Sequence, residues 1–266
     1  MAALTPATSA ALPRQPLFGG VNPTLLRYEL RRRFNRQTTV FTLLLPAVLY
    51  LALFHTAPQH ATMPNGNFAA WMMIGLAVYG AAMAATSSAA TISIERSTGW
   101  TRTIALTPLT PPGYLLVKVL SSVAMAVVPV GIVGVLGTLT GAHATTQVWV
   151  TSLTVAWVGS AVFAALGISM GLTMKPEVVM HMPGLTMTAL AFLGNLFIPL
   201  SGTMLTVSRY TPMYGVSTLA RYSLTGGYNF AGEHSSLAGA VFNLVAWFAG
   251  FSFLAVRRFA KSTARQ

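Results

Sequence analysis

Acidic residues and cysteine are what this chain of 266 residues most clearly lacks. The absence of cysteine excludes disulfides, thiolate metal sites and thiol catalysis. Aspartate is also absent, and only four acidic residues stand against 16 lysines and arginines, so few carboxylates are available for acid–base chemistry. Charged residues make up 8% of the chain and hydrophobic ones 54%, a composition that indicates an integral membrane protein.

The net charge of +12 raises nucleic acid as a possible partner. The basic residues, however, stand at the ends of apolar runs and do not follow one solvated face. Such an arrangement is typical of contact with anionic lipid and of signals for membrane orientation. We therefore expect membrane lipid as a partner and exclude nucleic acid.

The chain has no ATP-binding P-loop of the form Gly-x-x-x-x-Gly-Lys. The residues before Lys118, Lys175 and Lys261 are Val, Met and Ala. The chain is therefore not expected to hydrolyse ATP or to hold a cofactor of its own.

Two patterns suggest enzyme or metal chemistry and are better explained by packing. Residues 167–171 have the Gly-x-Ser-x-Gly form of a hydrolase elbow, but this form needs a strand-to-helix turn and here lies inside a continuous apolar run. Glu177 and His181 are four residues apart and could share a helix face, yet two ligands do not make a metal site. We expect no catalytic residue and no metal.

The predicted fold is all-α, with four regions. Residues 1–21 are expected to be a disordered tail. Residues 22–37 are expected to form an amphipathic helix on the membrane surface, with apolar and arginine-rich faces. Residues 38–256 form the membrane domain, and residues 257–266 a basic tail.

Apolar runs near the 20 residues or so that cross a bilayer predict six spans in the membrane domain. They cover residues 38–55, 68–94, 114–139, 148–173, 178–202 and 236–256. If both termini are cytosolic, every Lys and Arg except Arg209 and Arg221 lies on the cytosolic side, which the positive-inside bias favours. The location expected is a bacterial plasma or inner membrane.

Small residues and one long connection complete the predicted membrane domain. Three pairs of small residues are interpreted as helix packing positions: Gly80 with Ala84, Gly131 with Gly134, and Gly167 with Gly171. The connection 203–235 is too apolar for a free loop, so part of it is expected to dip back into the bilayer against protein.

A short polar island, residues 95–109, separates two of the long apolar runs. It begins Glu95-Arg96-x-x-Gly99, continues to Thr107-Pro108-Leu109, and is followed by Tyr114-x-x-x-Lys118. This order resembles the membrane-spanning permease subunit of type-2 ATP-binding-cassette exporters. A weaker match covers Asn195 to Ser201, Pro212 to Tyr214 and Arg221.

The resemblance implies that the island is a coupling helix, which docks on a separate P-loop ATPase that holds ATP and Mg. It also implies a working unit of two permeases and two ATPases. Glu95 would pair with a basic groove residue, Gly99 would allow close approach, Trp100 would enter a pocket and Pro108 would end the helix. An ordinary solvated loop is the alternative. The candidate coupling residues are Glu95, Arg96, Gly99, Trp100, Arg102, Thr107 and Pro108.

The resemblance places a transport path between two units, lined by the first, second and fifth spans. Aromatic and Met side chains there could repack around greasy ligands, or could simply face lipid. Asn195 stands out because a bare amide is costly in lipid. The candidate lining residues are Phe41, Tyr50, Phe54, Trp71, Met72, Tyr79, Met187, Phe192, Asn195 and Phe197.

The predicted function is export of a hydrophobic or amphipathic substrate, with drug, antibiotic, peptide, lipid and polysaccharide all open. One alternative is an ATP-independent transporter or channel, which would need ionisable groups at mid-membrane to couple an ion gradient. An intramembrane enzyme is the other alternative, and it would need a catalytic group.

Overall fold

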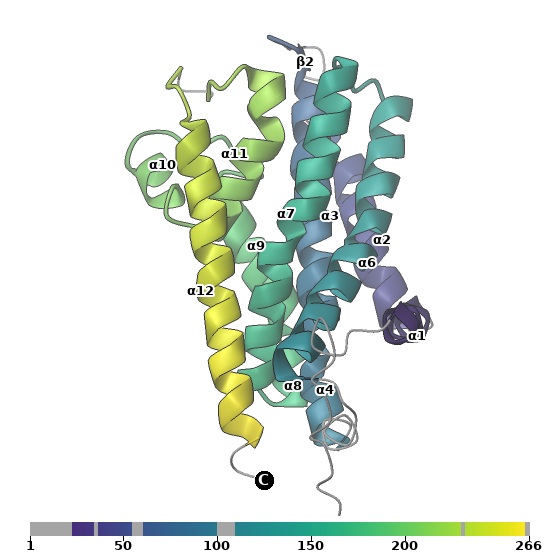
Figure 1. The fold of residues 1–266 in the computed structure, drawn as a ribbon. Helices are drawn as coiled ribbons and strands as arrows, with labels where there is room; N and C mark the ends of the chain where they lie inside the picture. The colour runs from purple at the N-terminus through teal and green to yellow at the C-terminus, as the bar shows by residue number, and fades with distance from the viewer. Residues whose placement is uncertain (1–22, 35–36, 55–60, 100–109, 230–231, 264–266) are drawn as a thin grey trace, which may run out of the picture.

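The computed structural model describes residues 23–34, 37–54, 61–99, 110–229 and 232–263. Over these residues the chain is a bundle of long helices with a small β-hairpin (Figure 1). The elements in chain order are α1 (Pro23–Phe34), α2 (Gln37–Phe54), β1 (Thr62–Met63), β2 (Gly66–Asn67), α3 (Phe68–Ala90), α4 (Ile92–Ser97), α6 (Pro111–Leu139), α7 (Thr146–Thr173), α8 (Pro176–Val179), α9 (Met182–Leu193), α10 (Gly202–Ser208), α11 (Pro212–Thr225) and α12 (Leu237–Thr263).

The two ends of the bundle carry different elements (Figure 1). The antiparallel pair β1–β2 lies at one end, which we call the hairpin end. Helices α4 and α8 and the end of α12 lie at the opposite end, which we call the α4 end. Helix α1 lies across the bundle near the α4 end, where Figure 1 shows it end-on. The predicted all-α fold is therefore correct except for the hairpin.

Within the described residues, four helices are long and apolar enough to cross a membrane. They are Phe68–Ser97, Pro112–Leu139, Thr146–Thr173 and Leu237–Ala260. Each covers one of the apolar runs expected from the sequence. Helix α2 is also apolar, but it has 18 residues and contains Pro46.

The run 178–202, predicted as one continuous span, is divided into separate pieces. Helix α8 ends at Val179, and α9 starts anew with Pro183 in its first turn, where proline is well tolerated. Helix α9 then ends after 12 residues at Gly194, and the chain turns through Asn195, whose φ is +58°. The prediction was wrong because apolarity sets where a segment is buried and does not require it to be one helix.

Helix α3 forms the centre of the bundle. It packs against α2, α6, α7, α9 and α11, and most of its side chains are buried. Small residues make this possible, since Gly80 lies against Pro46 and Pro129. Gly167 and Gly171 on α7 face the backbone of α3 and the turn that follows it. These three positions agree with the predicted packing role, whereas Gly131 faces open space.

Replacing Gly167 with leucine is expected to lower the free energy of unfolding by about 1–3 kcal/mol, the usual cost of overpacking. A Cβ there would overlap the backbone carbonyl of Thr86, which cannot move as a side chain can. Gly131→Leu is the matched control, because none of the atoms that the structure describes lies within 4 Å of its Cβ position. Thermal unfolding of both purified variants measures the difference; equal midpoints would contradict close packing of α3 on α7.

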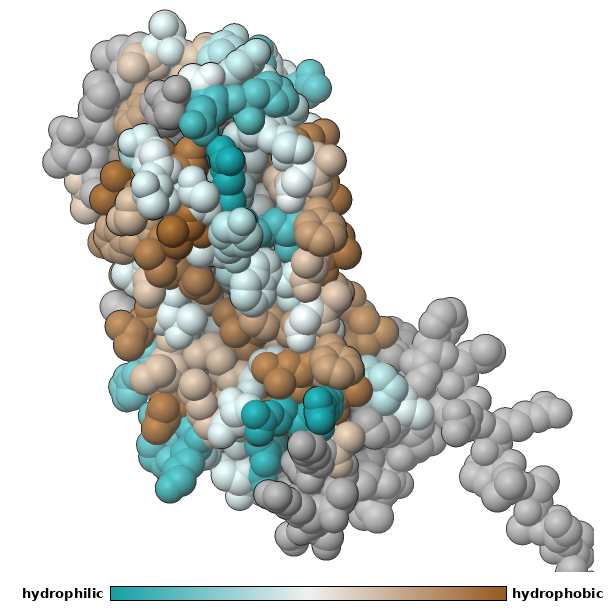
Figure 2. All heavy atoms as spheres, turned by 90° about the vertical axis from the view of Figure 1, so that its left-hand side faces the viewer, coloured by the Kyte–Doolittle hydropathy of each residue, from teal (hydrophilic) through white to brown (hydrophobic). Residues whose placement is uncertain are grey.

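The outer surface of the bundle is apolar around its middle. On the face that Figure 2 shows, brown side chains flank a paler strip at mid-height, and most teal ones lie toward the two ends. Helix α12 is the clearest case, since only 11% of its most apolar window is buried, and side chains such as Phe242 and Phe253 are exposed. Without water to satisfy polar groups, a lipid-facing surface takes this form.

Candidate coupling site and candidate pathway

A cluster of buried charged groups joins α1, α4 and α6. The Lys118 ammonium on α6 lies 3.0 Å from Glu29 on α1 and 2.5 Å from Glu95 on α4. The second carboxylate oxygen of Glu95 accepts a hydrogen bond from the Tyr114 hydroxyl. Lys118 is fully buried and both carboxylates are 3% exposed. We call these four residues the charge cluster.

The local sequence explains how α6 supplies two of these groups. Thr110 caps the helix by accepting a hydrogen bond from the Gly113 amide, and prolines at the first positions fix its start. Tyr114 and Lys118 then lie one turn apart on the same face of α6. Both can therefore reach the single carboxylate of Glu95.

Helix α4 is also fixed to the end of α7. The Ser93 hydroxyl donates to the carbonyl of Met174 at 2.9 Å. The Arg96 guanidinium donates to the carbonyl of Leu172 at 2.7 Å, where the last carbonyls of a helix lack intrahelical partners and favour a cation. Movement of α4 would therefore be transmitted to α1, α6 and α7 together.

The sequence expected Glu95 to pair with a basic residue of another protein, and the structure corrects this. Both Glu95 oxygens are engaged within the chain and the side chain is buried, so it is not presented to a partner. Gly99 has φ of +75° and is half-buried, and no atom of the described residues lies within 4 Å of its Cβ position. Trp100, Arg102, Thr107 and Pro108 lie outside the described residues.

Several candidate pathway residues are core residues in this structure. Tyr50 is fully buried and bonds through its hydroxyl to Thr140. Tyr79 bonds in the same way to Thr188 on α9, and Met187 is fully buried. These side chains are held between helices of one chain, so they do not line an open path here. The side chains of Phe41 and Phe54 lie outside the described residues.

Of the remaining candidates, Trp71 is buried at 4% exposure, and the other four lie closer to the surface. Phe192 is 48% exposed and contacts Phe197 edge-on, with ring centroids 5.3 Å apart. Phe197 also packs against Tyr79, and Met72 packs at the margin of the core. An aromatic patch at the end of α9 is therefore available to a ligand or to a second copy of the chain.

Arg221 on α11 is the functional candidate whose setting the sequence did not reveal. Its guanidinium donates hydrogen bonds to the carbonyls of Trp71, Asn195 and Leu196, at 3.3, 3.0 and 2.8 Å. It also stacks on the Trp71 ring, 3.5 Å from the ring centroid, in a cation–π arrangement. Gly75 leaves room for it, because a Cβ there would overlap the guanidinium. We call these contacts the Arg221 clamp.

The Arg221 clamp stabilises the break after α9. The carbonyls of Asn195 and Leu196 follow the end of α9, where no further helical turn can satisfy them. Asn195 also bonds through Oδ1 to the backbone amide of Leu200, which holds the left-handed turn. Asparagine tolerates this conformation better than most residues. A sequence signal did exist, namely an arginine within an apolar segment, but nothing indicated its partners.

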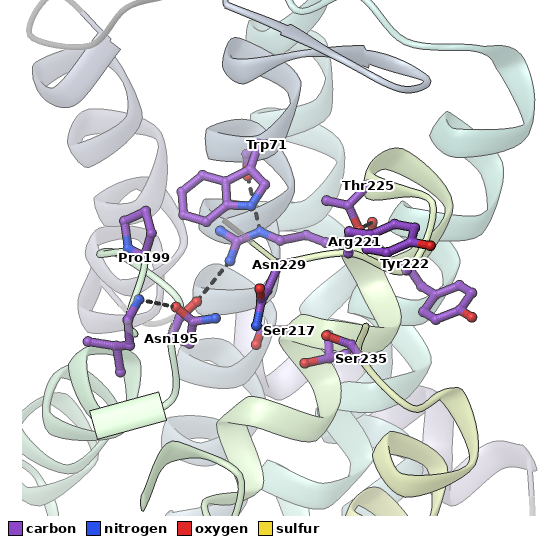
Figure 3. A pocket seen from close by; sticks show the side chains of 13 residues that line it. Trp71, Asn195, Pro199, Ser217, Arg221, Tyr222, Thr225, Asn229 and Ser235 are labelled. Carbon is purple, nitrogen blue, oxygen red and sulfur yellow. Dashed lines mark hydrogen bonds between the residues drawn. The ribbon is translucent and has the colours of Figure 1, made fainter. Parts of the chain in front are cut away.

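A pocket of about 40 Å³ adjoins the Arg221 clamp (Figure 3). Trp71, Asn195 and Arg221 border it together with residues of the loop that follows α11. Figure 3 shows Asn195, Ser217, Asn229 and Ser235 gathered around its centre from different elements. The pocket therefore joins three parts of the chain that are distant in sequence.

The two patterns that suggested enzyme or metal chemistry lie in a helix interior and on the surface. Ser169 lies within the continuous helix α7 and donates to the carbonyls of Ala165 and Phe251, so residues 167–171 form no elbow. Glu177 and His181 are exposed, and no group of three His, Cys, Asp or Glu side chains gathers anywhere in the described part of the chain.

The apolar helices, the apolar outer surface and the charge buried at one end define a multi-pass membrane protein. Residues 23–218 match the family model of the ABC-2 type transporter, and the chain belongs to this family. It is a permease component and not a catalytic subunit, which confirms the resemblance drawn from residues 95–118. A comparison with curated proteins found no match.

Proposed function

We propose that this chain is the permease subunit of an ATP-driven exporter for a hydrophobic or amphipathic substrate. A separate ATPase subunit would bind ATP and Mg, and a second copy of the chain would complete the path. The observation that carries the proposal is α4, which lies at one end of a bundle of this family and is tied to three other helices.

The proposed coupling runs through buried contacts and not through an exposed carboxylate. An ATPase that contacts the turn at Gly99 and the residues after it would push on α4. Because Glu95 and Arg96 hold α4 to α6 and α7, the push would tilt these helices as one body. Buried ion pairs suit this role, since they fix one arrangement of the helices that carry them.

Replacing Gly99 with tryptophan is expected to reduce association with the ATPase by at least about tenfold, the loss that one strong polar contact would give. A Cβ at Gly99 meets no atom of the described residues within 4 Å, so the effect is expected to arise at the partner. Gly99→Asn is the matched control, because asparagine tolerates the positive φ without the bulk.

Co-purification of each variant with the ATPase, followed by substrate-stimulated ATP hydrolysis, measures this effect. Glu177→Gln is a second control, since Glu177 is exposed on α8 at the same end. Full association and full stimulated turnover by Gly99→Trp would show that this turn is an ordinary loop, and the proposed coupling would be wrong.

We further propose that both termini and the α4 end are cytosolic, in a bacterial plasma membrane. Single cysteines can test this, because the chain has none of its own. Cysteines at Thr62, Thr145 and Ser235 should react from outside intact cells, and those at Thr98 and Ser262 only after permeabilisation. Labelling of Thr98 from outside would reverse the proposed orientation.

We propose that the aromatic patch of Phe192 and Phe197, with Met72 and Asn195, faces the transport path. All four are partly exposed, unlike the buried Tyr50, Tyr79 and Met187, and Phe192, Asn195 and Phe197 lie at the end of α9 or just after it. A helix that ends inside a bundle gives a ligand access that a continuous helix would close. We therefore propose that the part of the run 178–202 that follows Leu190 lines the transport path.

A further inference from the structure

The pocket beside the Arg221 clamp is rich in hydrogen-bond donors, and none of the residues that line it is acidic. Its volume of about 40 Å³ is roughly three times what one water needs, which is room for a group of a few heavy atoms. It is also partly open on one side, so a larger molecule could place only its end group inside.

The charge of Arg221 indicates which kind of ligand this pocket favours. The side chain is 5% exposed, and its hydrogen bonds go to backbone carbonyls, which are neutral. No carboxylate of the described residues forms an ion pair with it. A guanidinium has five N–H donors, and the three hydrogen bonds to carbonyls use three of the five. A buried cation without a counter-charge is costly, so this pocket favours an anion.

Asn195 supplies a second donor. Its Oδ1 must be the oxygen that accepts from the Leu200 amide, because an NH₂ group there could not accept. The orientation of the amide is therefore determined, and its NH₂ end is left facing the pocket that Asn195 lines. That NH₂ group makes no hydrogen bond with any residue that the structure describes.

Hydroxyl groups complete the set. Thr218, Tyr222 and Ser235 line the pocket, and their hydroxyls bond to no described residue. Glu233, the acidic residue of this end of the chain, pairs with Arg209 at 2.8 Å on the surface and is not part of the lining. The pocket lining thus offers several hydrogen-bond donors, and no carboxylate among the lining residues competes for them.

We propose that this pocket binds a small oxyanion, a carboxylate or a phosphate, through Arg221, Asn195 and the neighbouring hydroxyls. The group could belong to a soluble molecule or to the headgroup of an anionic lipid. The inference goes beyond the proposed export function and does not depend on it, because binding can be measured on the full-length chain without an ATPase.

Asn195→Asp is the decisive variant. Aspartate keeps the oxygen that accepts from Leu200 and tolerates the left-handed turn, but it replaces the NH₂ donor with a negatively charged oxygen beside Arg221. Oxyanion binding should fall at least tenfold, while the midpoint of thermal unfolding should stay the same or rise. Tyr222→Phe removes one neutral donor and should weaken binding by about 2- to 10-fold.

Arg209→Gln is the matched control, since Arg209 is an exposed arginine in the same part of the chain and is not in the lining. It should bind as the wild type does. Should Asn195→Asp fail to fold, the pair Tyr222→Phe and Ser235→Ala replaces it, because neither hydroxyl bonds within the described protein.

Two probes distinguish the sources of the oxyanion. Native mass spectrometry of protein from nanodiscs of phosphatidylcholine, with or without phosphatidylglycerol, counts retained anionic lipid. The shift of the unfolding midpoint by sodium phosphate or benzoate, against sodium chloride at equal ionic strength, reports soluble oxyanions. Binding of either probe that Asn195→Asp abolishes supports the site and identifies its source. If neither probe binds, or if Asn195→Asp binds as the wild type does, the proposal is overturned.

Discussion

Replacing Lys118 with methionine is expected to lower the free energy of unfolding by about 3–5 kcal/mol, the cost of removing one member of a buried ion pair. The ammonium is shared by Glu29 and Glu95, and both carboxylates are nearly inaccessible to water. Methionine fills a similar volume, so the loss would come from charge and not from packing. Few single changes in this chain should cost more, because most substitutions cost about 1 kcal/mol.

The origin of this loss can be tested by removing the remaining charges. Adding Glu29→Gln and Glu95→Gln to Lys118→Met should restore much of the lost stability, since neutral groups are cheaper to bury. Denaturation of the purified chain in mixed detergent, followed by tryptophan fluorescence, gives the free energies. If Lys118→Met is as stable as the wild type, the charge cluster is not buried as described.

Replacing Arg221 with methionine is expected to lower the free energy of unfolding by about 3 kcal/mol or more. The substitution leaves the carbonyls of Asn195 and Leu196, which follow the end of α9, without their donor, and each unsatisfied buried group costs roughly 1–3 kcal/mol. It also removes the cation–π contact with the Trp71 ring. The turn after α9 should open first, because the Arg221 clamp holds it.

Two comparisons make the Arg221 measurement specific. Arg209→Met removes an exposed ion pair and should cost about 0–1 kcal/mol. Gly75→Ala should be costly in the wild type, where its Cβ would overlap the guanidinium, and less costly in the Arg221→Met background. The difference between the two costs is the coupling energy of the pair. If the two costs are simply additive, the absence of a side chain at Gly75 is not needed to accommodate Arg221.

The charge cluster and the Arg221 clamp each hold a short segment in place, in different parts of the bundle. The charge cluster holds the short helix α4, and the Arg221 clamp holds the turn that follows the short helix α9. Short helical pieces bury too little apolar surface to fix their own position. Contacts of buried charged groups fix the position of these short segments, and burying the charged groups costs free energy that a fully apolar span does not spend.

The amino-acid composition and the order of residues along the chain were enough to predict the class of this protein and the positions of its long helices. The apolar runs predicted the positions of α3, α6, α7 and α12 because crossing a bilayer takes a fixed length of apolar chain. The motif from Glu95 to Lys118 indicated the family, which residues 23–218 match. The structure gives the physical reason for that motif, since Glu95, Tyr114 and Lys118 bond to one another.

The partners of the polar residues were decided only by the tertiary structure. Glu29 joins Glu95 from a helix more than 60 residues earlier, and Arg221 reaches Trp71 from a helix 150 residues later. Apolar periodicity carries no record of such contacts, because it reports which segments are buried and not which ones meet. For the same reason, the sequence described Glu95 as available to a partner and the run 178–202 as one span, whereas packing engaged the first and divided the second.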